Sequence, residues 1–465
     1  MKTDFSVLIL AAGEGTRMKS ALPKVLHPVS GVPMLLKVLD TVRGLRPKSV
    51  GIVAGSGADE VKKAVGSFPG LTWILQKERK GSGHAVKQAS SWIRRGASSA
   101  PHLMVLCGDA PLIKAETLRA LHEAHLKAGN AATALSAKVA NPLGYGRIEK
   151  DDFGRVKRIV EEKDASPAQR GIREVNSGVY FFDAAKLLQA LTELKNDNAK
   201  KEFYLTDVIE ILDKKGFKAA SVVSANGIGE TVGINSRADL AAAQGQDQQD
   251  ILAGWMKEGV TVFSPATTYV DARARIGKDS VLLPGTMIMG STVIGEGSTI
   301  GPNAYIEDSK IGGGCTVRAS FVYGATVEDD VNIGPFTHIR QGSLVKKGAR
   351  VGNFSEVKKS VLGKGAKVSH LSYVGDAEIG DDVNVGAGVI TCNFDGVNKH
   401  KTVIGRKTFV GSNVNLVAPV TVGEGSVIGA GSTITENVPA HSLALARPFQ
   451  IVKKNWVKNK KRKKS

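Results

Sequence analysis

Aliphatic residues recur at every sixth position through the second half of the chain. Three runs show this period, over residues 276–306, 327–357 and 404–434. Many of these residues are followed directly by glycine, as in Ile294-Gly295 and Val422-Gly423. A period of six predicts one short strand and one turn per repeat, with the aliphatic side chains stacked inward and glycine relieving the tight turn. The pattern indicates a parallel β-helix of hexapeptide repeats.

The interruptions of this period are also informative. It shortens to five between Ile306 and Ile311, and an insertion separates Thr391 from Ile404. The inserted residues 392–400 must leave the coil as a loop. Loops on a rigid scaffold are natural places for a ligand contact.

The first half of the chain has a different pattern, in which short apolar runs alternate with helical periodicity. The apolar runs cover residues 5–10, 49–54, 71–75 and 103–106, and the helical patterns cover 34–45 and 115–128. Strands that alternate with helices predict a mostly parallel, doubly wound α/β sheet of Rossmann-like type. The domains expected from these patterns are an α/β domain at 1–235, a linker helix at 236–259, a β-helix at 260–452 and a basic tail at 453–465.

Composition narrows the class of protein. With 465 residues and 42% hydrophobic positions, the chain is too long for one compact core and too apolar to be disordered throughout. Its net charge is +19, and the last thirteen residues contribute seven Lys and one Arg without an acidic residue. A disordered, solubilising end is the favoured interpretation of this tail, although nucleic acid or an anionic membrane surface would also fit its charge.

The three cysteines, Cys107, Cys315 and Cys392, are odd in number and far apart. They predict neither a disulfide framework nor a zinc site, which fits a reducing compartment. No apolar run approaches the roughly 18 residues of a membrane span. We therefore expect a cytoplasmic protein.

A candidate phosphate-binding turn follows the first predicted strand. Gly13-Glu14-Gly15 would let backbone N–H groups approach a phosphate, but Met18 stands where the dinucleotide fingerprint has its third glycine. Arg17 and Lys24 add two cations that would hold a polyphosphate and stabilise the charge that develops in nucleotidyl transfer. Asp109, after the strand 103–106, is suited to hold Mg²⁺ on phosphates.

His370 is the candidate base within the repeats. A histidine has an unperturbed pKa of about 6.5, near working pH, and is suited to general-base catalysis. Arg340, Lys358 and Tyr373 fall in the preceding and same coils, and two cations with a phenol suit a sugar phosphate.

These motifs together resemble a known family. The first motif, Leu-Ala-Ala-Gly-x-Gly-Thr-Arg-Met followed by Leu-Pro-Lys, resembles the sugar-phosphate nucleotidyltransferases. The whole chain, from residue 3 to about 450, resembles the bifunctional N-acetylglucosamine-1-phosphate uridyltransferases and glucosamine-1-phosphate N-acetyltransferases. Further segments that carry this resemblance are Gly144-Tyr145-Gly146-Arg147-Ile148, Ile159-Val160-Glu161, Asn176-Ser177-Gly178 and Asn393-Phe394-Asp395-Gly396.

The resemblance implies two reactions. Acetyl transfer from acetyl-CoA to glucosamine 1-phosphate would come first, and uridylyl transfer from UTP to N-acetylglucosamine 1-phosphate, with release of pyrophosphate, would follow. The product, UDP-N-acetylglucosamine, is a precursor of peptidoglycan and lipopolysaccharide. The resemblance also implies a left-handed β-helix, a homotrimer with acetyltransferase sites shared between subunits, and Mg²⁺ at the uridyltransferase site.

The resemblance assigns roles to individual residues. It implies that Arg17 and Lys24 face the phosphates, that Asp109 and Asn235 bind the metal, and that His370 is the base. The other uridyltransferase residues implied are Leu10, Ala11, Ala12, Gly13, Gln76, Gly81, Ser82, Cys107 and Gly108 around the nucleotide, and Gly144, Glu161 and Asn176 around the sugar. In the β-helix, Arg340, Lys358, Tyr373, Asn384 and Asn393 would bind glucosamine 1-phosphate, with Glu356 orienting a partner, and Ala387, Asn393, Phe394, Ser412, Ala430 and Arg447 would contact acetyl-CoA.

Three positions depart from the family pattern. Ser82 stands where the family commonly has Thr and keeps the hydroxyl. Cys107 and Phe394 each stand where it commonly has Tyr, so one loses an aromatic face and the other a hydroxyl. These departures put individual contacts, and not the reactions, in doubt.

Two other functions remain open from the residues. In one, only the N-terminal domain is an enzyme and the β-helix is an oligomerisation or regulatory domain. In the other, the chain is a structural or exchange-factor subunit whose tail contacts RNA. The presence of Arg340 and Lys358 beside His370 argues against the first of these functions. Against the second stand the residues suited to catalysis that the chain retains, namely Arg17, Lys24, Asp109 and Asn235.

Overall fold

The computed structural model describes residues 4–55, 57–68 and 70–462 of the chain. It divides into two compact units, Met1–Asp247 and Gln248–Ser465. The boundary lies within α9 (Arg237–Lys257), in the segment where the sequence predicts a linker helix. Each unit is described below by itself.

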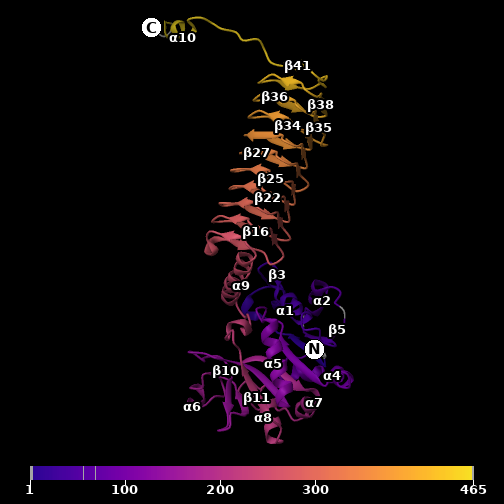
Figure 1. Cartoon of the computed structure of the whole chain (residues 1–465), viewed down its shortest axis with the longest axis vertical. Helices are drawn as coiled ribbons and strands as arrows, with labels where there is room; N and C mark the ends of the chain where they lie inside the picture. The colour runs from indigo at the N-terminus through magenta and orange to yellow at the C-terminus, as the bar shows by residue number, and fades with distance from the viewer. Residues whose placement is uncertain (1–3, 56, 69, 463–465) are drawn as a thin grey trace. The chain divides into compact units, whose positions relative to one another are not determined.

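The first unit contains a mixed, mostly parallel sheet (Figure 1). Its strand order is β11-β7-β10-β6-β1-β4-β5, and β10 runs antiparallel to its neighbours β6 and β7. The strands are β1 (Phe5–Ala11), β4 (Val50–Ala54), β5 (Leu71–Leu75), β6 (His102–Cys107), β7 (Ala132–Lys138), β10 (Glu174–Asp183) and β11 (Ala219–Val223). Strands β8 (Arg147–Lys150) and β9 (Val156–Val160) form a hairpin that pairs with β10. Strands β2 (Pro28–Val29) and β3 (Val32–Pro33) form a separate small pair. The predicted strands 5–10, 49–54, 71–75 and 103–106 fall on β1, β4, β5 and β6.

Helices cover the sheet because its strands are apolar on both faces. Leu8 and Val105 pack into one buried cluster, whereas Val7, Ile9 and Met104 pack into another. The helices are α1 (Met34–Arg43), α2 (Ala58–Val65), α3 (Ser82–Gln88), α4 (Ser90–Gly96), α5 (Ala115–Ala128), α6 (Pro167–Arg170), α7 (Ala184–Thr192) and α8 (Asp207–Lys214), with short 3-10 turns η1 (Thr16–Met18), η2 (Lys24–Leu26) and η3 (Gly229–Thr231). The doubly wound class predicted from the sequence is confirmed.

We expect a buried histidine to make the stability of this unit depend on pH. His125 on α5 is fully buried, and its ring lies 4.9 Å from that of Phe181 on β10. Burial, together with His102, lowers the pKa of His125 to about 3. In the unfolded chain this pKa is near 6.5, so the neutral form is the one that the fold accommodates.

Lowering the pH from 7 to 5 is therefore expected to destabilise the first unit through His125. Below pH 6.5 the unfolded state binds a proton at His125 that the folded state does not. The contribution of His125 to the free energy of unfolding is therefore fully present above pH 6.5 and is lost as the pH falls toward 3. The loss is at most about 1.4 kcal/mol per pH unit. The variant His125→Gln keeps a polar group toward Thr133. Calorimetry should show that its unfolding temperature falls less steeply with decreasing pH than that of the wild type. Equal slopes would contradict the assignment.

The second unit is a parallel β-helix whose short strands stack coil upon coil (Figure 1). The described strands form three sheets with one strand of each per coil, so three repeats make one turn of the helix. Val281 pairs with Thr299 eighteen residues later, and Val293 pairs with Lys310 seventeen residues later, where the period shortens. The predicted hexapeptide β-helix is confirmed, and its regular stacking is consistent with the left-handed form.

The three sheets use consecutive strands in rotation. The first contains β12 (Thr261–Val262), β15 (Val281–Leu282), β18 (Thr299–Ile300), β21 (Thr316–Val317), β24 (Asn332–Ile333), β27 (Arg350–Asn353), β30 (Lys367–His370), β33 (Asn384–Val385), β36 (Phe409–Val410), β39 (Val427–Ile428) and β41 (Leu443–Ala444). The second contains β13 (Tyr269–Val270), β16 (Met287–Met289), β19 (Tyr305–Glu307), β22 (Phe321–Tyr323), β25 (His338–Ile339), β28 (Glu356–Lys358), β31 (Tyr373–Gly375), β34 (Ile390–Cys392), β37 (Asn415–Val417) and β40 (Thr433–Ile434). The third contains β14 (Arg275–Ile276), β17 (Val293–Ile294), β20 (Lys310–Ile311), β23 (Thr326–Val327), β26 (Leu344–Val345), β29 (Val361–Leu362), β32 (Ala377–Ile379), β35 (Thr402–Ile404) and β38 (Val420–Val422), and η4 (Pro265–Thr267) precedes β13.

The repeated aliphatic residues form the core of the β-helix. Ile288, Ile300 and Val351 are each fully buried within one continuous cluster. Burial of such a side chain contributes about 1.5–3 kcal/mol, so the ladder of repeats stabilises the coil along its length. Glycine is required where coils approach closely: a Cβ at Gly277 would lie 2.5 Å from the backbone nitrogen of Glu296. This contact explains why glycine follows the aliphatic position.

The chain ends in an exposed basic segment. The structure has a helix, α10 (Trp456–Arg462), in the tail that the sequence analysis expects to be disordered. The Lys460 ammonium lies 4.9 Å from the Trp456 ring one turn away, a contact that favours helical backbone here. Residues 463–465 of this tail lie outside the described residues. Among the helices that the structure describes, none is long and apolar enough to cross a membrane.

Candidate functional site

The glycine-rich turn and Asp109 meet at one edge of the first unit's sheet. Strands β1 and β6 are parallel neighbours with Leu10 paired to Cys107, so their carboxyl ends coincide. The Gly108 N–H donates to the Leu10 carbonyl at 2.9 Å, which fixes the start of one loop against the end of the other strand. Ligands bind at this edge in open α/β sheets.

Three polar side chains converge beside this turn. The Lys24 ammonium on η2 contacts the Asp109 carboxylate and lies 2.8 Å from the Asn235 side-chain oxygen. Lys24 is only 7% exposed. The Ile234 N–H donates to the Asp109 backbone carbonyl at 2.9 Å, which brings residues far apart in sequence to one place.

Asp239, which the sequence analysis does not single out, and Gly15 of the phosphate-binding turn hold this cluster in position. The Asp239 carboxylate accepts the backbone N–H groups of Asn235 and Ser236 at 3.0 and 2.8 Å. Gly15 has φ +66, and a Cβ there would lie 2.6 Å from Cβ of Lys24. Gly15 is therefore needed both for its left-handed backbone and for the space that the Lys24 stem occupies.

The cluster fits a hard divalent cation. Asp109 and Asn235 present a carboxylate and an amide oxygen that already converge on the ammonium of Lys24, and Mg²⁺ prefers such oxygen ligands. Within residues 4–55, 57–68 and 70–462, no group of three or more His, Cys, Asp or Glu side chains could hold a metal by itself. Mg²⁺ characteristically uses one or two carboxylates together with substrate phosphates and water.

The expected nucleotide residues lie along the same edge, where Gln76 is buried and Gly13, Arg17 and Ser82 are exposed. Gln76 directly follows β5, is buried, and lies 3.4 Å from the Gly81 carbonyl and 3.0 Å from a ring nitrogen of His84. Arg17 is exposed on η1 and is not bonded into the Lys24 cluster. The structure thus groups Lys24, Asp109 and Asn235 and leaves Arg17 at the rim.

Two of the departures from the family pattern have structural consequences. The Ser82 hydroxyl accepts the Leu205 backbone N–H at 3.1 Å, so the hydroxyl that replaces threonine also positions the start of α3. Burial and the nearby Asp109 raise the pKa of the Cys107 thiol to about 12. Cys107 therefore stays protonated and is not a nucleophile.

Two of the expected sugar residues, Glu161 and Asn176, lie close together beside the β8–β9 hairpin. A Cβ on Gly146 would lie 3.5 Å from Asn176 and 3.6 Å from the Glu161 carboxylate, so these three residues are close neighbours. Glu161 accepts from the Thr206 hydroxyl at 3.2 Å, and burial raises its pKa. Gly144 is exposed, with its N–H donating to Glu162 at 2.9 Å.

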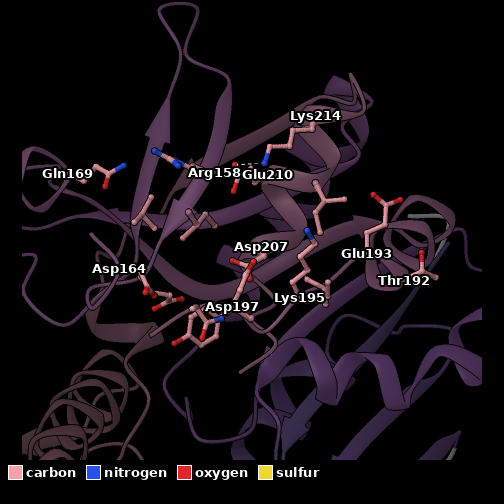
Figure 2. Close-up of a pocket in the computed structure, with 17 residues that line it drawn as sticks. Arg158, Asp164, Gln169, Thr192, Glu193, Lys195, Asp197, Asp207, Glu210 and Lys214 are labelled. Carbon is pink, nitrogen blue, oxygen red and sulfur yellow. Dashed lines mark ion pairs between the residues drawn. The ribbon is translucent and has the colours of Figure 1, made fainter. Parts of the chain in front are cut away.

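Glu161 also lines a pocket of about 840 Å³ (Figure 2). Figure 2 shows Asp164, Asp197 and Asp207 gathered at one end of it and the ion pair of Glu210 with Lys214 at the other. Burial and Glu161 raise the pKa of Asp207 to about 6. In the part of the chain that the structure describes, the buried Tyr204 hydroxyl on this pocket has no hydrogen-bond partner. Carboxylates outnumber the cations Arg158, Lys195 and Lys214 on this lining, which favours a ligand that donates hydroxyl groups.

His370 in the β-helix is held by a residue of the preceding coil. Strand β27 pairs with β30 so that Asn353 stands directly opposite His370. The side-chain oxygen of Asn353 lies 2.6 Å from His370 Nδ1. An Asn carbonyl oxygen accepts, so Nδ1 carries the proton and the exposed Nε2 keeps its lone pair. This is the tautomer that a general base requires.

Replacing Asn353 with alanine is expected to lower kcat of the acetyl transfer expected at His370 by about tenfold, a part of what general-base catalysis contributes. KM for the amino sugar should stay unchanged, because Asn353 acts through His370. Asn353→Asp should restore kcat and move the acidic limb of the pH–rate profile upward, since a carboxylate favours imidazolium. A variant Asn353→Ala that loses affinity and not kcat would show a merely structural role.

Charged side chains line the second sheet near His370. Arg340 pairs with Glu356 at 2.8 Å, so its charge is largely offset. Lys358 in the same sheet approaches Lys399 of the insertion loop, and this contact lowers the pKa of Lys399. Two ammonium groups held together favour an anion between them. Lys399 is absent from the sequence-based site because only the folded loop brings it to Lys358.

Some of the expected acetyl-CoA residues form a column above His370, whereas Asn393 and Phe394 lie in the insertion loop. The strand registers place Ala387, Ser412 and Ala430 at the position equivalent to His370 in successive coils. The Arg447 guanidinium donates to the Ala430 carbonyl at 2.8 Å and so joins the end of this column. A long, narrow ligand could lie along the corner of the β-helix with one end at His370. Tyr373 follows His370 around the same corner, whereas Asn384 stacks on Lys367.

The insertion predicted at 392–400 leaves the coil as a loop that begins at Asn393, because Cys392 still belongs to β34 and pairs with Val417. Asn393 is buried and donates to the Asp376 carboxylate at 2.5 Å, which anchors the start of the loop. The loop closes through a bond of 2.6 Å between His400 and Asp395. Phe394 is 58% exposed, so its ring is available to a ligand or a neighbouring chain.

Comparison with known proteins gives matches along the whole chain. A family model described as MobA-like NTP transferase domain matches residues 7–206, and one described as bacterial transferase hexapeptide (six repeats) matches residues 273–308 and 401–436. Curated relatives called "Bifunctional protein GlmU" include one from Geobacillus sp. (strain WCH70), 49% identical over 97% of both chains. Another from Halalkalibacterium halodurans is 48% identical over 99% of this chain and 100% of its own, and one from Caldanaerobacter subterraneus subsp. tengcongensis is 47% identical over 98% of both.

Proposed function

The chain belongs to the family of bifunctional GlmU proteins, and from that premise we propose how its residues make UDP-N-acetylglucosamine at two separate sites. The family has glucosamine-1-phosphate acetyltransferase and N-acetylglucosamine-1-phosphate uridyltransferase activities and serves cell-wall biosynthesis. We assign acetyl transfer to the β-helix and uridylyl transfer to the first unit. The observation that carries this assignment is the pair of unrelated clusters, Lys24-Asp109-Asn235 in one unit and Asn353-His370 in the other.

In the first unit, the reaction needs positioning and charge neutralisation and no covalent intermediate on the protein. A phosphate oxygen of N-acetylglucosamine 1-phosphate attacks the α-phosphorus of UTP as the bond to pyrophosphate breaks. Lys24 and Arg17 hold the phosphates, and Asp109 and Asn235 would hold magnesium, which when bound supplies further positive charge against the phosphates. Glu161 and Asn176 orient the sugar, consistent with the hydroxyl-accepting pocket beside them.

In the β-helix, His370 is the general base. Its Nε2 takes a proton from the amine of glucosamine 1-phosphate as the nitrogen attacks the thioester carbon of acetyl-CoA, and CoA leaves as the carbon–sulfur bond breaks. Lys358 and Lys399 bind the sugar phosphate, together with Arg340 and Tyr373. CoA lies along the column that Ala387, Ser412, Ala430 and Arg447 form.

A homotrimer completes this proposal. A single β-helix presents His370 and Phe394 on exposed surface, which leaves the site open on one side. A neighbouring copy that covers this face would exclude water from the thioester.

The experiment that tests the proposal measures the two half-reactions separately. Purified protein with UTP, N-acetylglucosamine 1-phosphate and Mg²⁺ should release pyrophosphate, and protein with acetyl-CoA and glucosamine 1-phosphate should release CoA. Release of pyrophosphate without any release of CoA would reduce the β-helix to a scaffold. If the protein released neither pyrophosphate nor CoA, the result would favour an exchange-factor or structural subunit instead.

A further inference from the structure

The cation that Asp109 and Asn235 bind in this structure is an ammonium group of the chain itself. Lys24 contacts the Asp109 carboxylate and lies 2.8 Å from the Asn235 oxygen, the two atoms assigned to the metal in the proposed function. With 7% of its surface exposed, Lys24 is enclosed at this position. Its ammonium group therefore stands where a metal ion bound by the same two oxygens would stand.

An ammonium group and a divalent ion cannot share this place. Both need the single negative charge of Asp109, and two cations at such short range repel each other strongly in a partly buried site. The other oxygen ligand, the side-chain amide of Asn235, carries no net charge. Metal binding therefore requires Lys24 to leave.

The structure offers Lys24 another position nearby. Lys24 borders a small cavity of about 160 Å³ that Gly13 and Glu14 of the phosphate-binding turn also line. Its stem lies against Gly15 of the same turn, where the missing Cβ makes room for it. Phosphates on that turn would provide the negative charge that compensates Lys24 once it leaves Asp109.

We propose that Lys24 occupies the metal site of the nucleotide-free enzyme and gives it up when nucleotide phosphates draw the ammonium group away. The inference rests on the proposed function in taking Asp109 and Asn235 as metal ligands. Lys24 thereby couples the binding of metal to that of nucleotide. Metal alone binds weakly because it must displace Lys24 without compensation.

The test is a titration of the full chain with Mn²⁺, without nucleotide, followed by calorimetry or by the loss of the free Mn²⁺ electron-spin-resonance signal. Lys24→Met removes the charge and keeps an unbranched side chain of similar length. Its Mn²⁺ affinity should exceed that of the wild type by about 5- to 150-fold, the usual size of coupling between linked sites. Lys24→Arg keeps a cation near Asp109 and should bind Mn²⁺ as weakly as the wild type.

Controls make each outcome decisive. Lys24→Met combined with Asp109→Asn should return Mn²⁺ binding to the weak level, which locates the gain at Asp109. Unfolding midpoints verify that the variants fold, and Lys24→Gln replaces Lys24→Met if that variant does not. Equal Mn²⁺ affinity in the wild type and the neutral variants overturns the inference. The experiment measures Mn²⁺ binding and not catalysis. Equal affinities would therefore leave the roles of these residues in uridylyl transfer intact. A variant that only loses uridylyl transfer activity would not affect the inference about Lys24.

Discussion

Replacing His370 with alanine is expected to lower kcat of acetyl transfer by about 10²- to 10⁴-fold, the contribution of a general base. The amine of glucosamine 1-phosphate must lose a proton as it attacks, and Nε2 of His370 is the basic atom that Asn353 keeps free. Because the uridyltransferase cluster belongs to the other unit, pyrophosphate release from supplied N-acetylglucosamine 1-phosphate should not change. Stopped assays of CoA and pyrophosphate on the same preparation measure both effects.

The matched control for this prediction is His441→Ala. His441 stands on a turn of the same β-helix, against Gly425, and precedes a strand of the first sheet, whereas the column above His370 follows the strands of that sheet. It should keep wild-type rates for both products. If His370→Ala retains more than about a tenth of the wild-type CoA release, another group is the base and the assignment is wrong.

Replacing Asp109 with asparagine is expected to reduce uridylyl transfer by about 10²- to 10³-fold, the size of effect seen when one electrostatic contact to the transition state is lost. Asparagine keeps the size of the side chain but removes the charge that Lys24 contacts and that a metal would require. The reduction should appear in kcat, with acetyl transfer unchanged. Pyrophosphate release over a range of UTP and Mg²⁺ concentrations measures it.

Asp152→Asn serves as the control because Asp152 is an exposed carboxyl in the β8–β9 turn. It should leave both reactions at wild-type rates. Should Asp109→Asn behave like Asp152→Asn, Asp109 is a structural residue at the end of β6, the ordinary alternative for an acid in that place.

The features that could be predicted from the sequence are those that depend on patterns among residues close together along the chain. The hexapeptide period depends only on spacing along the chain, so the β-helix and its loop at 392–400 follow from it directly. Asp109 could be placed beside Gly13 because both follow buried parallel strands, whose carboxyl ends meet at one edge. In both cases one known geometric rule links the sequence to the position.

The residues that the sequence does not predict act across the fold. Asn353 precedes His370 by seventeen residues and meets it only because a shortened coil puts the two in register. Asp239 holds Asn235 from the first turn of α9, and Lys399 reaches Lys358 only through the shape of the insertion loop. None of these three has a local pattern that separates it from an ordinary polar surface residue.

The central claim is that the two reactions occur at two separate and independent sites. If N-acetylglucosamine 1-phosphate is released from one site and binds at the other, a mixing experiment tests this claim most directly. His370→Ala and Asp109→Asn are each incubated with glucosamine 1-phosphate, acetyl-CoA, UTP and Mg²⁺, first alone and then together, and UDP-N-acetylglucosamine is measured. The account predicts little product from either variant alone and restored synthesis from the mixture, because Asp109→Asn releases the N-acetylglucosamine 1-phosphate that His370→Ala consumes. Synthesis by either variant alone at the wild-type rate, or a mixture that stays as inactive as its components, would contradict it.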